Sequence, residues 1–368
     1  MPETIVVTGG AGFIGSVLCR DLVAAGHAVR VLDALDPQVH GDAGPGREPR
    51  TRERFVQGDI RDPEAVRSAV SDADVVIHLA AQVGVGQSMY EIATYVGVND
   101  LGTAVLLQAL IDHPVRRIVV ASSMSVYGEG RYVNALGETV AAGRRRPEDI
   151  AAGRWEVGGD SALRPAPTAE DKPVDLASIY ALTKYVQERA VLLFGEAYRV
   201  EAVALRLFNV FGPGQALSNP YTGVLANFAS RLAAGERPTI FEDGLQRRDF
   251  VHVEDVARAF RLALDAPAAP GHVINVGSGR SYTIAEVARI LAGAMGLAVE
   301  PEILKKARIG DIRHCYADIG KARDLLGFAP KLHLENALDP FVEWVAGQDY
   351  RDRGPEMRRQ LEARGLVS

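Results

Sequence analysis

The chain has 368 residues, of which 47% are hydrophobic and 24% charged, and its formal net charge is −6. This acidic balance argues against a general nucleic-acid binder, and the two cysteines, Cys19 and Cys315, lie too far apart in sequence for a disulfide framework or a cysteine-rich zinc site. No apolar stretch reaches the roughly 20 residues that span a bilayer, and the N-terminus lacks a signal-peptide pattern. We therefore expect a soluble cytoplasmic protein that binds neither nucleic acid nor membrane and holds no metal.

Short apolar runs alternate with segments of helical periodicity along most of the chain. Strands are expected over residues 4–7, 28–32, 55–56, 75–79, 118–121, 202–207 and 272–276, and helices over 13–25, 63–70, 103–111 and 179–198. Strand and helix alternating in this way predict an α/β fold with a doubly wound parallel sheet and helices on both of its faces.

Three segments lack this pattern. Residues 36–54 and 128–177 are rich in Gly, Pro and Arg and are expected to form irregular loops, the longer one functional or partly disordered. Arg144, Arg145 and Arg146 form the only tight basic run, which we interpret as a solvated loop. From about Gln348 the chain is charged, and a peripheral helix or a frayed tail is expected there.

A glycine-rich motif follows the first expected strand and opens the first helix. Gly9, Gly12 and Gly15 would permit a tight turn, the approach of a pyrophosphate and close helix–strand packing, and the helix N-terminus would hold that pyrophosphate. Asp33 ends the second strand, where a carboxylate accepts both hydroxyls of an adenosine ribose and repels a 2′-phosphate; its alternative role is that of a turn or capping residue. The motif predicts a Rossmann-type domain that binds NAD rather than NADP.

Further strand ends should lie beside the cofactor, because ligands of open α/β sheets bind at the carboxyl ends of the strands. Asp59 and Ile60 follow the third strand, and Leu79, Ala80 and Ala81 end the fourth. Without the glycine motif, both sites would be read equally well as ordinary strand ends.

A tyrosine and a lysine begin the helix expected over 179–198. Tyr180 and Lys184 are four residues apart and share one helical face, so the ammonium would lower the pKa of the phenol from about 10 toward neutrality. Such a base can remove the hydroxyl proton of an alcohol as a hydride leaves. Ser122 and Ser123 end the fifth strand, where a hydroxyl can hydrogen-bond the same oxygen. This spacing alone is common on helix surfaces, but its combination with the glycine motif favours a redox site.

Taken together, these motifs resemble the NAD-dependent epimerase/dehydratase family of extended short-chain dehydrogenases/reductases, from about residue 5 to about residue 344. The likeness rests on TGGAGFIG (8–15), Asp33, DIRD (59–62), HLAA (78–81), SSMSVYG (122–128), YALTK (180–184), LRLFNVFGPGQ (205–215) and RRDFVHVEDVA (247–257). It implies an NAD-binding domain over 1–211, with 246–278 returning to it and an insertion at 129–177. A smaller α/β nucleotide-sugar-binding domain would comprise 212–245 and 279–345, followed by a tail over 346–368.

The resemblance also implies a nucleoside-diphosphate-sugar substrate and a set of site residues. The catalytic residues would be Ser123, Tyr180 and Lys184. Cofactor-binding residues would be Gly9, Gly12, Phe13, Ile14, Gly15, Asp33, Asp59, Ile60, Leu79, Ala80, Ala81, Ser122, Tyr180, Lys184 and Phe208. Substrate-binding residues would be Gln87, Ser88, Ser123, Met124, Ser125, Asn209, Val224, Ile240, Phe241, Arg248, Arg308, Asp311 and Cys315.

Some of these roles have plain alternatives. Arg248 and Arg308 would clamp the pyrophosphate, because a guanidinium fork matches phosphate geometry, but either could form a surface salt bridge instead. Cys315 would be a small residue gating the sugar pocket, or simply a small buried hydrophobe.

The residues after Ser123 bear on the reaction. Family dehydratases carry Asp-Glu there, whereas this chain has Met124 and Ser125, so 4,6-dehydration is not expected. The resemblance implies a 4-epimerase working through a transient 4-keto sugar, on a dTDP-6-deoxyhexose such as dTDP-L-rhamnose or on a UDP-hexose. Relatives with similar segments often carry cysteine pairs in the insertion, and this chain has none between residues 128 and 180.

Other activities stay open from the sequence. A 4-ketoreductase or dehydrogenase with net redox change would use the same residues, and a non-catalytic NAD-binding regulator would keep the fold alone. The resemblance further implies a homodimer in which the helices over 103–111 and 179–198 form a four-helix interface.

Overall fold

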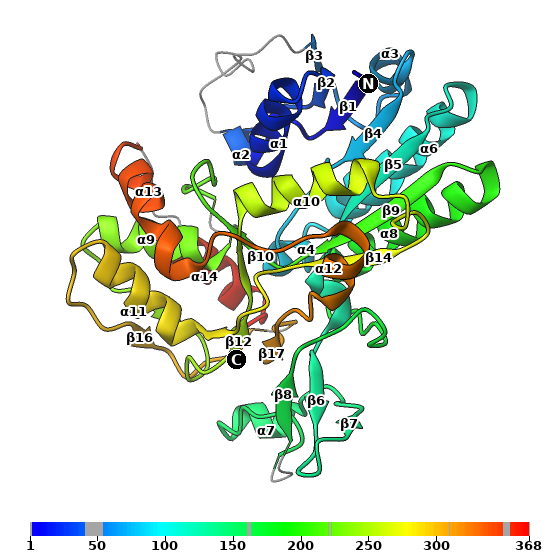
Figure 1. Cartoon of the computed structure of the whole chain (residues 1–368). Coiled ribbons are helices and arrows are strands. Elements are labelled where there is room, and N and C mark those ends of the chain that lie inside the picture. Colours follow the sequence, from blue (N-terminus) through cyan, green and yellow to red (C-terminus); the bar gives the residue numbers. More distant parts are fainter. Residues whose placement is uncertain are drawn as a thin grey trace.

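The computed structural model describes residues 2–40, 54–159, 163–219, 221, 223–308, 310–348 and 354–367 (Figure 1). Its central sheet has seven parallel strands, in the order β14-β9-β5-β4-β1-β2-β3. They are β1 (Thr4–Thr8), β2 (Ala28–Asp33), β3 (Arg54–Gln57), β4 (Val75–His78), β5 (Arg117–Ser123), β9 (Glu201–Leu207) and β14 (Val273–Val276). The predicted Rossmann-type sheet is confirmed, including the return of the last strand beside β9.

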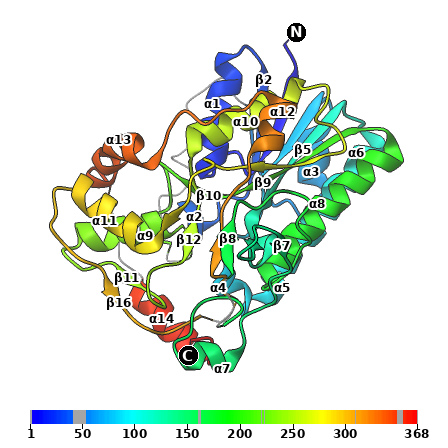
Figure 2. The ribbon, with the colours of Figure 1, turned by 60° about the horizontal axis from the view of Figure 1, so that its bottom comes forward.

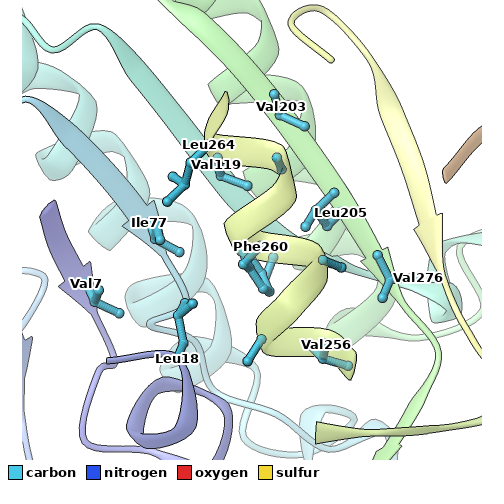
Figure 3. Close-up of a cluster of buried hydrophobic side chains, with 14 of the residues drawn as sticks. Val7, Leu18, Ile77, Val119, Val203, Leu205, Val256, Phe260, Leu264 and Val276 are labelled. Atoms are coloured by element: carbon cyan, nitrogen blue, oxygen red, sulfur yellow. The ribbon is translucent and has the colours of Figure 1, made fainter. Parts of the chain in front are cut away.

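Helices cover both faces of the sheet because successive strand residues point to opposite sides. On one face, Ile5 and Val7 of β1 pack with α1 (Phe13–Ala24), α10 (Val253–Asp265) and α12 (Gly320–Leu326). Figure 3 shows Phe260 of α10 lying against this face of the sheet. On the other face, Val6 packs with α3 (Pro63–Val70), α6 (Gly102–Asp112) and α8 (Ile179–Tyr198). The four predicted helices are thereby confirmed: the bounds of α3 and α8 are as predicted, and those of α1 and α6 differ by one residue at one end and at both ends, respectively.

One helix in the described part of the chain is long and apolar enough to cross a membrane by length and composition alone. It runs for 21 residues from Ile92 to Asp112. An 18-residue stretch of it has a mean hydropathy of 1.2, and 39% of that stretch is buried. It consists of α5 (Ile92–Tyr95), the π-helical η1 (Val96–Leu101) and α6. The hydrophobic period predicts a helix only from residue 103, so this length was not expected. Packing of α6 on the sheet between α3 and α8 accounts for much of its apolar character.

A second core lies beside the sheet, built around α9 (Val224–Ala233), α11 (Ile284–Ala294) and α13 (Leu334–Ala346). Short strand pairs connect it to the rest: β10 (Asn209–Phe211) with β13 (Phe250–His252), and β11 (Thr239–Ile240) with β16 (Glu302–Ile303). β12 (Arg247–Arg248) lies between β15 (Tyr282–Thr283) and β17 (His314–Cys315). Residues of β10, β11 and β12 lie around the same cavity as Met124 and Ser125, which follow β5.

The segments expected to be irregular contain regular structure. Within 128–177, β6 (Arg131–Val133), β7 (Thr139–Val140) and β8 (Arg164–Ala166) form an antiparallel sheet, accompanied by α7 (Pro147–Ala151). In Figure 1 this insertion projects from the rest of the molecule at the bottom of the view. The loop expected over 36–54 begins with the short α2 (Pro37–His40), and residues 41–53 lie outside the described part. α14 (Gly354–Ala363) follows near the C-terminus.

Candidate active site

The glycine motif forms a tight turn between β1 and α1. Gly9 has φ +70°, and a Cβ added to it would lie 2.8 Å from the backbone nitrogen of Ala80 at the end of β4. A Cβ on Gly15 would lie 2.4 Å from the Gly9 carbonyl oxygen, and one on Gly12 would lie 3.3 Å from it. Because all three residues lack side chains, a dinucleotide can approach the loop backbone and the N–H groups that open α1. The loop therefore has the shape that a pyrophosphate cradle needs.

Asp33 fastens this loop to the end of β2. Its carboxylate accepts hydrogen bonds from the Ala11 N–H at 3.0 Å and from the Leu35 N–H at 2.8 Å, and His40 Nε2 lies 3.6 Å away. Asp33 thus has the turn role that we considered as an alternative. A carboxylate has about four acceptor positions, so acceptor capacity also remains for ribose hydroxyls.

The other expected cofactor residues differ in their surroundings. Asp59 forms an ion pair with Arg61 at 2.6 Å, and Ile60 is buried against Gly102. Leu79, Ala80 and Ala81 follow β4, Ile14 packs on the first core, and Phe13 opens α1. Phe208 lies apart from them, in a buried cluster with Met124, Tyr127 and Cys315.

Ser123 and Tyr180 meet where β5 ends and α8 begins. A hydrogen bond joins their side chains, and the Ser125 hydroxyl lies 2.9 Å from that of Ser123. Ser88 accepts a hydrogen bond from the Tyr180 N–H at 3.0 Å, which holds the first turn of α8. The ring of Tyr95 stands edge-on to that of Tyr180, with 6.4 Å between centroids. The phenol and the serine hydroxyl can therefore contact the same substrate oxygen.

Lys184 lies one turn further along α8 and is buried. Its ammonium donates to Gln187 Oε1 at 2.6 Å, and Gln187 Nε2 in turn donates to Thr103 Oγ1 at 2.9 Å. Burial lowers the pKa of Lys184 to about 7, partly offset by the nearby Glu188 carboxylate. Ser122 also contacts Glu188, through a hydrogen bond of 2.6 Å from its hydroxyl.

The expectation that Lys184 lowers the pKa of Tyr180 is wrong for the chain without ligands. Burial raises the pKa of the Tyr180 phenol, and the hydrogen bond from Ser123 only partly counters this. The physical reason is that desolvation penalises the phenolate.

A cavity of about 290 Å³ opens beside these residues. Many of the expected substrate-binding residues line it: Met124, Ser125, Asn209, Val224, Ile240, Phe241, Arg248, Arg308 and Asp311. Asn209 Oδ1 and Gln246 Oε1 belong to cavity-lining residues and are buried without a hydrogen-bond partner among the described residues. Unsatisfied buried acceptors are costly, so these two oxygens favour a ligand that supplies donors.

The two expected clamp arginines differ in their contacts. Arg308 forms the salt bridge that we considered, with Asp311 at 2.8 Å, and its guanidinium lies 4.6 Å from the ring centroid of Phe241. Arg248 donates to the backbone carbonyls of Ile312 at 2.6 Å and Arg313 at 2.9 Å. Both arginines still border the cavity.

Four expected substrate residues do not line the cavity. Cys315 is 1% exposed, packs near Thr168 and fits the buried-hydrophobe alternative, so it does not gate this cavity. Gln87 is buried and exchanges hydrogen bonds of 2.8 and 3.0 Å with Gln38. Ser88 accepts the hydrogen bond from the Tyr180 N–H, and Ser123 directly precedes the lining residues Met124 and Ser125 in the chain.

The structure adds cavity residues that sequence reasoning missed. Gln246 directly precedes the segment RRDFVHVEDVA (247–257), and nothing in the sequence marks its amide as a substrate-binding group. Tyr221 and Asn227 also line the cavity, as do Gly354, Met357, Arg358 and Leu361 of α14. The tail was expected to be peripheral, so its part in the cavity is a correction.

The basic run in the insertion is solvated at Arg144 and Arg146, with side chains 63% and 66% exposed, but not at Arg145. The Arg145 side chain is 4% exposed and pairs with Glu242 at 2.6 Å and with Glu129 at 3.4 Å. The Arg313 side chain is 0% exposed and binds Glu242 at 3.0 Å. Arg145 also donates to the carbonyl of Asp311 at 3.0 Å. This ion cluster, formed by Glu129, Arg145, Glu156, Glu242, Asp243 and Arg313, joins the insertion to the cavity wall.

His314 extends the ion cluster. Its Nε2 lies 3.0 Å from Glu156 Oε2. That hydrogen bond, followed by those from Arg313, lowers the pKa of the Glu156 carboxyl to about 2 against the opposing effect of burial. The Glu156 carboxylate is therefore ionised at neutral pH.

A model of the NAD-dependent epimerase/dehydratase family matches residues 5–277. The chain belongs to this family. It is accordingly an NAD-dependent enzyme, and the glycine loop at the end of β1 has the shape that NAD requires. The family match confirms the resemblance inferred from the motifs.

Individual relatives match over nearly their whole length. A dTDP-L-rhamnose 4-epimerase of Burkholderia thailandensis is 36% identical over 350 residues, covering 94% of this chain and 95% of the relative. The solved UDP-glucose 4-epimerase of Thermus thermophilus, in complex with NAD, is 32% identical, with a TM-score of 0.74 over 94% of this chain and all of that one (100%). A UDP-N-acetylglucosamine 4-epimerase of Methanobrevibacter ruminantium, solved with UDP-N-acetylmuramic acid, is 30% identical, with a TM-score of 0.78 over 95% and 99%.

Proposed function

We propose that this enzyme is a nucleotide-sugar 4-epimerase that acts on a dTDP-6-deoxyhexose such as dTDP-L-rhamnose, or else on a UDP-hexose. The observation that carries the proposal is the hydrogen-bonded pair of Ser123 and Tyr180 beside a cavity bordered by Arg248 and Arg308. A diphosphate among the arginines would place a sugar hydroxyl near the pair.

The reaction follows from the chemistry of these residues. Tyr180 would act as the base in its phenolate form, which positive charge brought near it must favour against the effect of burial. The phenolate takes the proton of the C4 hydroxyl, and Ser123 hydrogen-bonds the oxygen as it becomes a carbonyl. NAD held at the glycine loop would supply the acceptor for the C4 hydride, and would return it to the opposite face once the sugar had turned about its diphosphate linkage. Tyr180 then gives the proton back, so the cycle has no net redox change.

Two observations support epimerisation over dehydration. Met124 and Ser125 line the cavity where an elimination catalyst would need acid and base groups. The relatives described above are 4-epimerases of three different nucleotide sugars. The relative from B. thailandensis favours dTDP-L-rhamnose for this chain, and the UDP-sugar relatives favour the alternative.

Purified enzyme incubated with dTDP-L-rhamnose or UDP-glucose tests the proposal. We expect the C4 epimer to form from one of them without accumulation of NADH, as followed by chromatography with mass detection and by absorbance of NADH. A stoichiometric demand for NADH, or net reduction of NAD, would instead identify a ketoreductase or dehydrogenase.

We also propose a homodimer in which α6 and α8 of two copies form a four-helix interface. Leu101, Ile111, Leu182 and Leu193 are large hydrophobic residues on or beside these helices, and all are exposed in the single chain. Burial of such residues between copies would be favourable. Sedimentation equilibrium should therefore give twice the monomer mass, and a monomer at micromolar concentration would contradict the interface.

A further inference from the structure

One wall of the cavity comes from the C-terminal helix α14. Gly354, Met357, Arg358 and Leu361 line the cavity, and their spacing of three and four residues puts them on one helical face. Met357 and Leu361 are buried, whereas Arg359 on the other side of the helix is exposed. The helix therefore presents one side to the cavity and the other to solvent.

Polar contacts hold α14 at this place. Gln360 Oε1 accepts a hydrogen bond of 3.0 Å from the hydroxyl of Tyr90, which follows α4 (Val85–Ser88). Glu362 pairs with Lys306 at 3.0 Å, close to the expected clamp residue Arg308. Figure 2 shows α14 at the lower end of the molecule, below β16. These contacts attach α14 to two separate segments of the chain.

The charged residues that line the cavity differ in whether they have a partner of opposite charge. The charged lining residues are Glu242, Arg248, Arg308, Asp311 and Arg358. Both acids are paired, Asp311 with Arg308 and Glu242 with arginines of the ion cluster. Arg248 contacts only neutral carbonyls. Among the described residues, the Arg358 guanidinium has neither a hydrogen bond nor an ion pair. Two uncompensated positive charges, on Arg248 and Arg358, therefore border the cavity.

We propose that Arg358 binds the diphosphate of the nucleoside-diphosphate sugar and is a third arginine of the substrate site. A diphosphate in such a sugar carries two negative charges, which matches the uncompensated pair, and the guanidinium fork suits phosphate oxygens. The inference rests on the proposed function, because it takes the cavity to be the nucleotide-sugar site. It gives the C-terminal helix a direct role in substrate affinity.

Arg358→Met and Arg358→Lys test this assignment, with Arg359→Met as the matched control one residue away on the exposed side. Binding of UDP, dTDP and uridine is measured by calorimetry on the NAD-loaded enzyme, and KM and kcat are measured with the nucleotide sugar that the enzyme converts. We expect Arg358→Met to weaken UDP and dTDP binding about tenfold or more, as for a charged hydrogen bond. KM should rise by a similar factor at unchanged kcat, and Arg358→Lys should be intermediate.

Three results separate the possible failures. UDP and dTDP binding equal to that of the unaltered enzyme in Arg358→Met would overturn the role of Arg358 while leaving the proposed function intact. An equal loss for uridine would place Arg358 at the nucleoside, and would also overturn the diphosphate assignment. An unaltered enzyme that binds neither UDP nor dTDP would refute the proposed function and the inference with it.

Discussion

Replacing Tyr180 with phenylalanine should lower kcat by about 10²- to 10⁴-fold, the usual contribution of a positioned general acid–base group. The phenol is hydrogen-bonded to Ser123, and the ring packs edge-on against Tyr95. Phenylalanine keeps the ring contacts and removes only the proton-transferring hydroxyl. Steady-state rates of sugar interconversion measure the effect, and the melting temperature shows whether the fold is retained.

Tyr198 offers a matched control on the same helix. It lies at the C-terminal end of α8, is exposed, and stacks on Phe194 with 4.7 Å between ring centroids. Tyr198→Phe removes a hydroxyl remote from Ser123 and should leave kcat within about twofold. The role of Tyr180 as the base would be refuted if Tyr180→Phe retained more than a tenth of the unaltered rate.

Replacing Arg313 with methionine should destabilise the protein by about 3–5 kcal/mol, because it removes a buried cation from a cluster rich in carboxylates, one of which, Glu242, is itself buried. The Arg313 side chain is 0% exposed and contacts Glu156, Glu242 and Asp243. Glu242 is 1% exposed and would keep only its pair with Arg145. The free energy of unfolding in urea, measured near neutral pH, gives the size of the effect.

The surface pair Arg289–Glu300 provides the comparison. Both side chains are largely exposed, at 54% and 67%, and Arg289→Met should change the free energy of unfolding by less than about 1 kcal/mol.

Arg313→Met should also raise KM, because the ion cluster adjoins the cavity residues Asp311 and Ile312. A loss of under about 1 kcal/mol for Arg313→Met would mean that the cluster relaxes or admits water.

Local patterns explain why much of the fold could be predicted. β1, α1 and β2 follow from apolar runs and glycines within about thirty residues, where the hydrophobic period decides the structure. Ser123 and Tyr180 lie far apart in sequence, yet each falls at the end of an element that its own periodicity predicts. Their meeting then follows from the sheet, since β5 and α8 pack together.

Features that depend on distant partners escaped prediction. Arg145 has the appearance of a solvated residue in its Gly- and Arg-rich segment, and its buried position depends on partners such as Glu242, 97 residues away. The strands β6 to β8 are two or three residues long and too short to display a period. Cys315 gave no signal that distinguishes a gate from a core residue, because a small apolar side chain suits both places.

The order in which the cavity walls occur along the chain has a consequence for biosynthesis. The glycine loop lies within the first fifteen residues, whereas residues from Val85 to Leu361 surround the cavity. A growing chain emerges from the ribosome N-terminus first, so the NAD-binding elements are available to fold long before α14 has been made. The glycine loop can thus form well before α14, which completes one wall of the cavity, has been made.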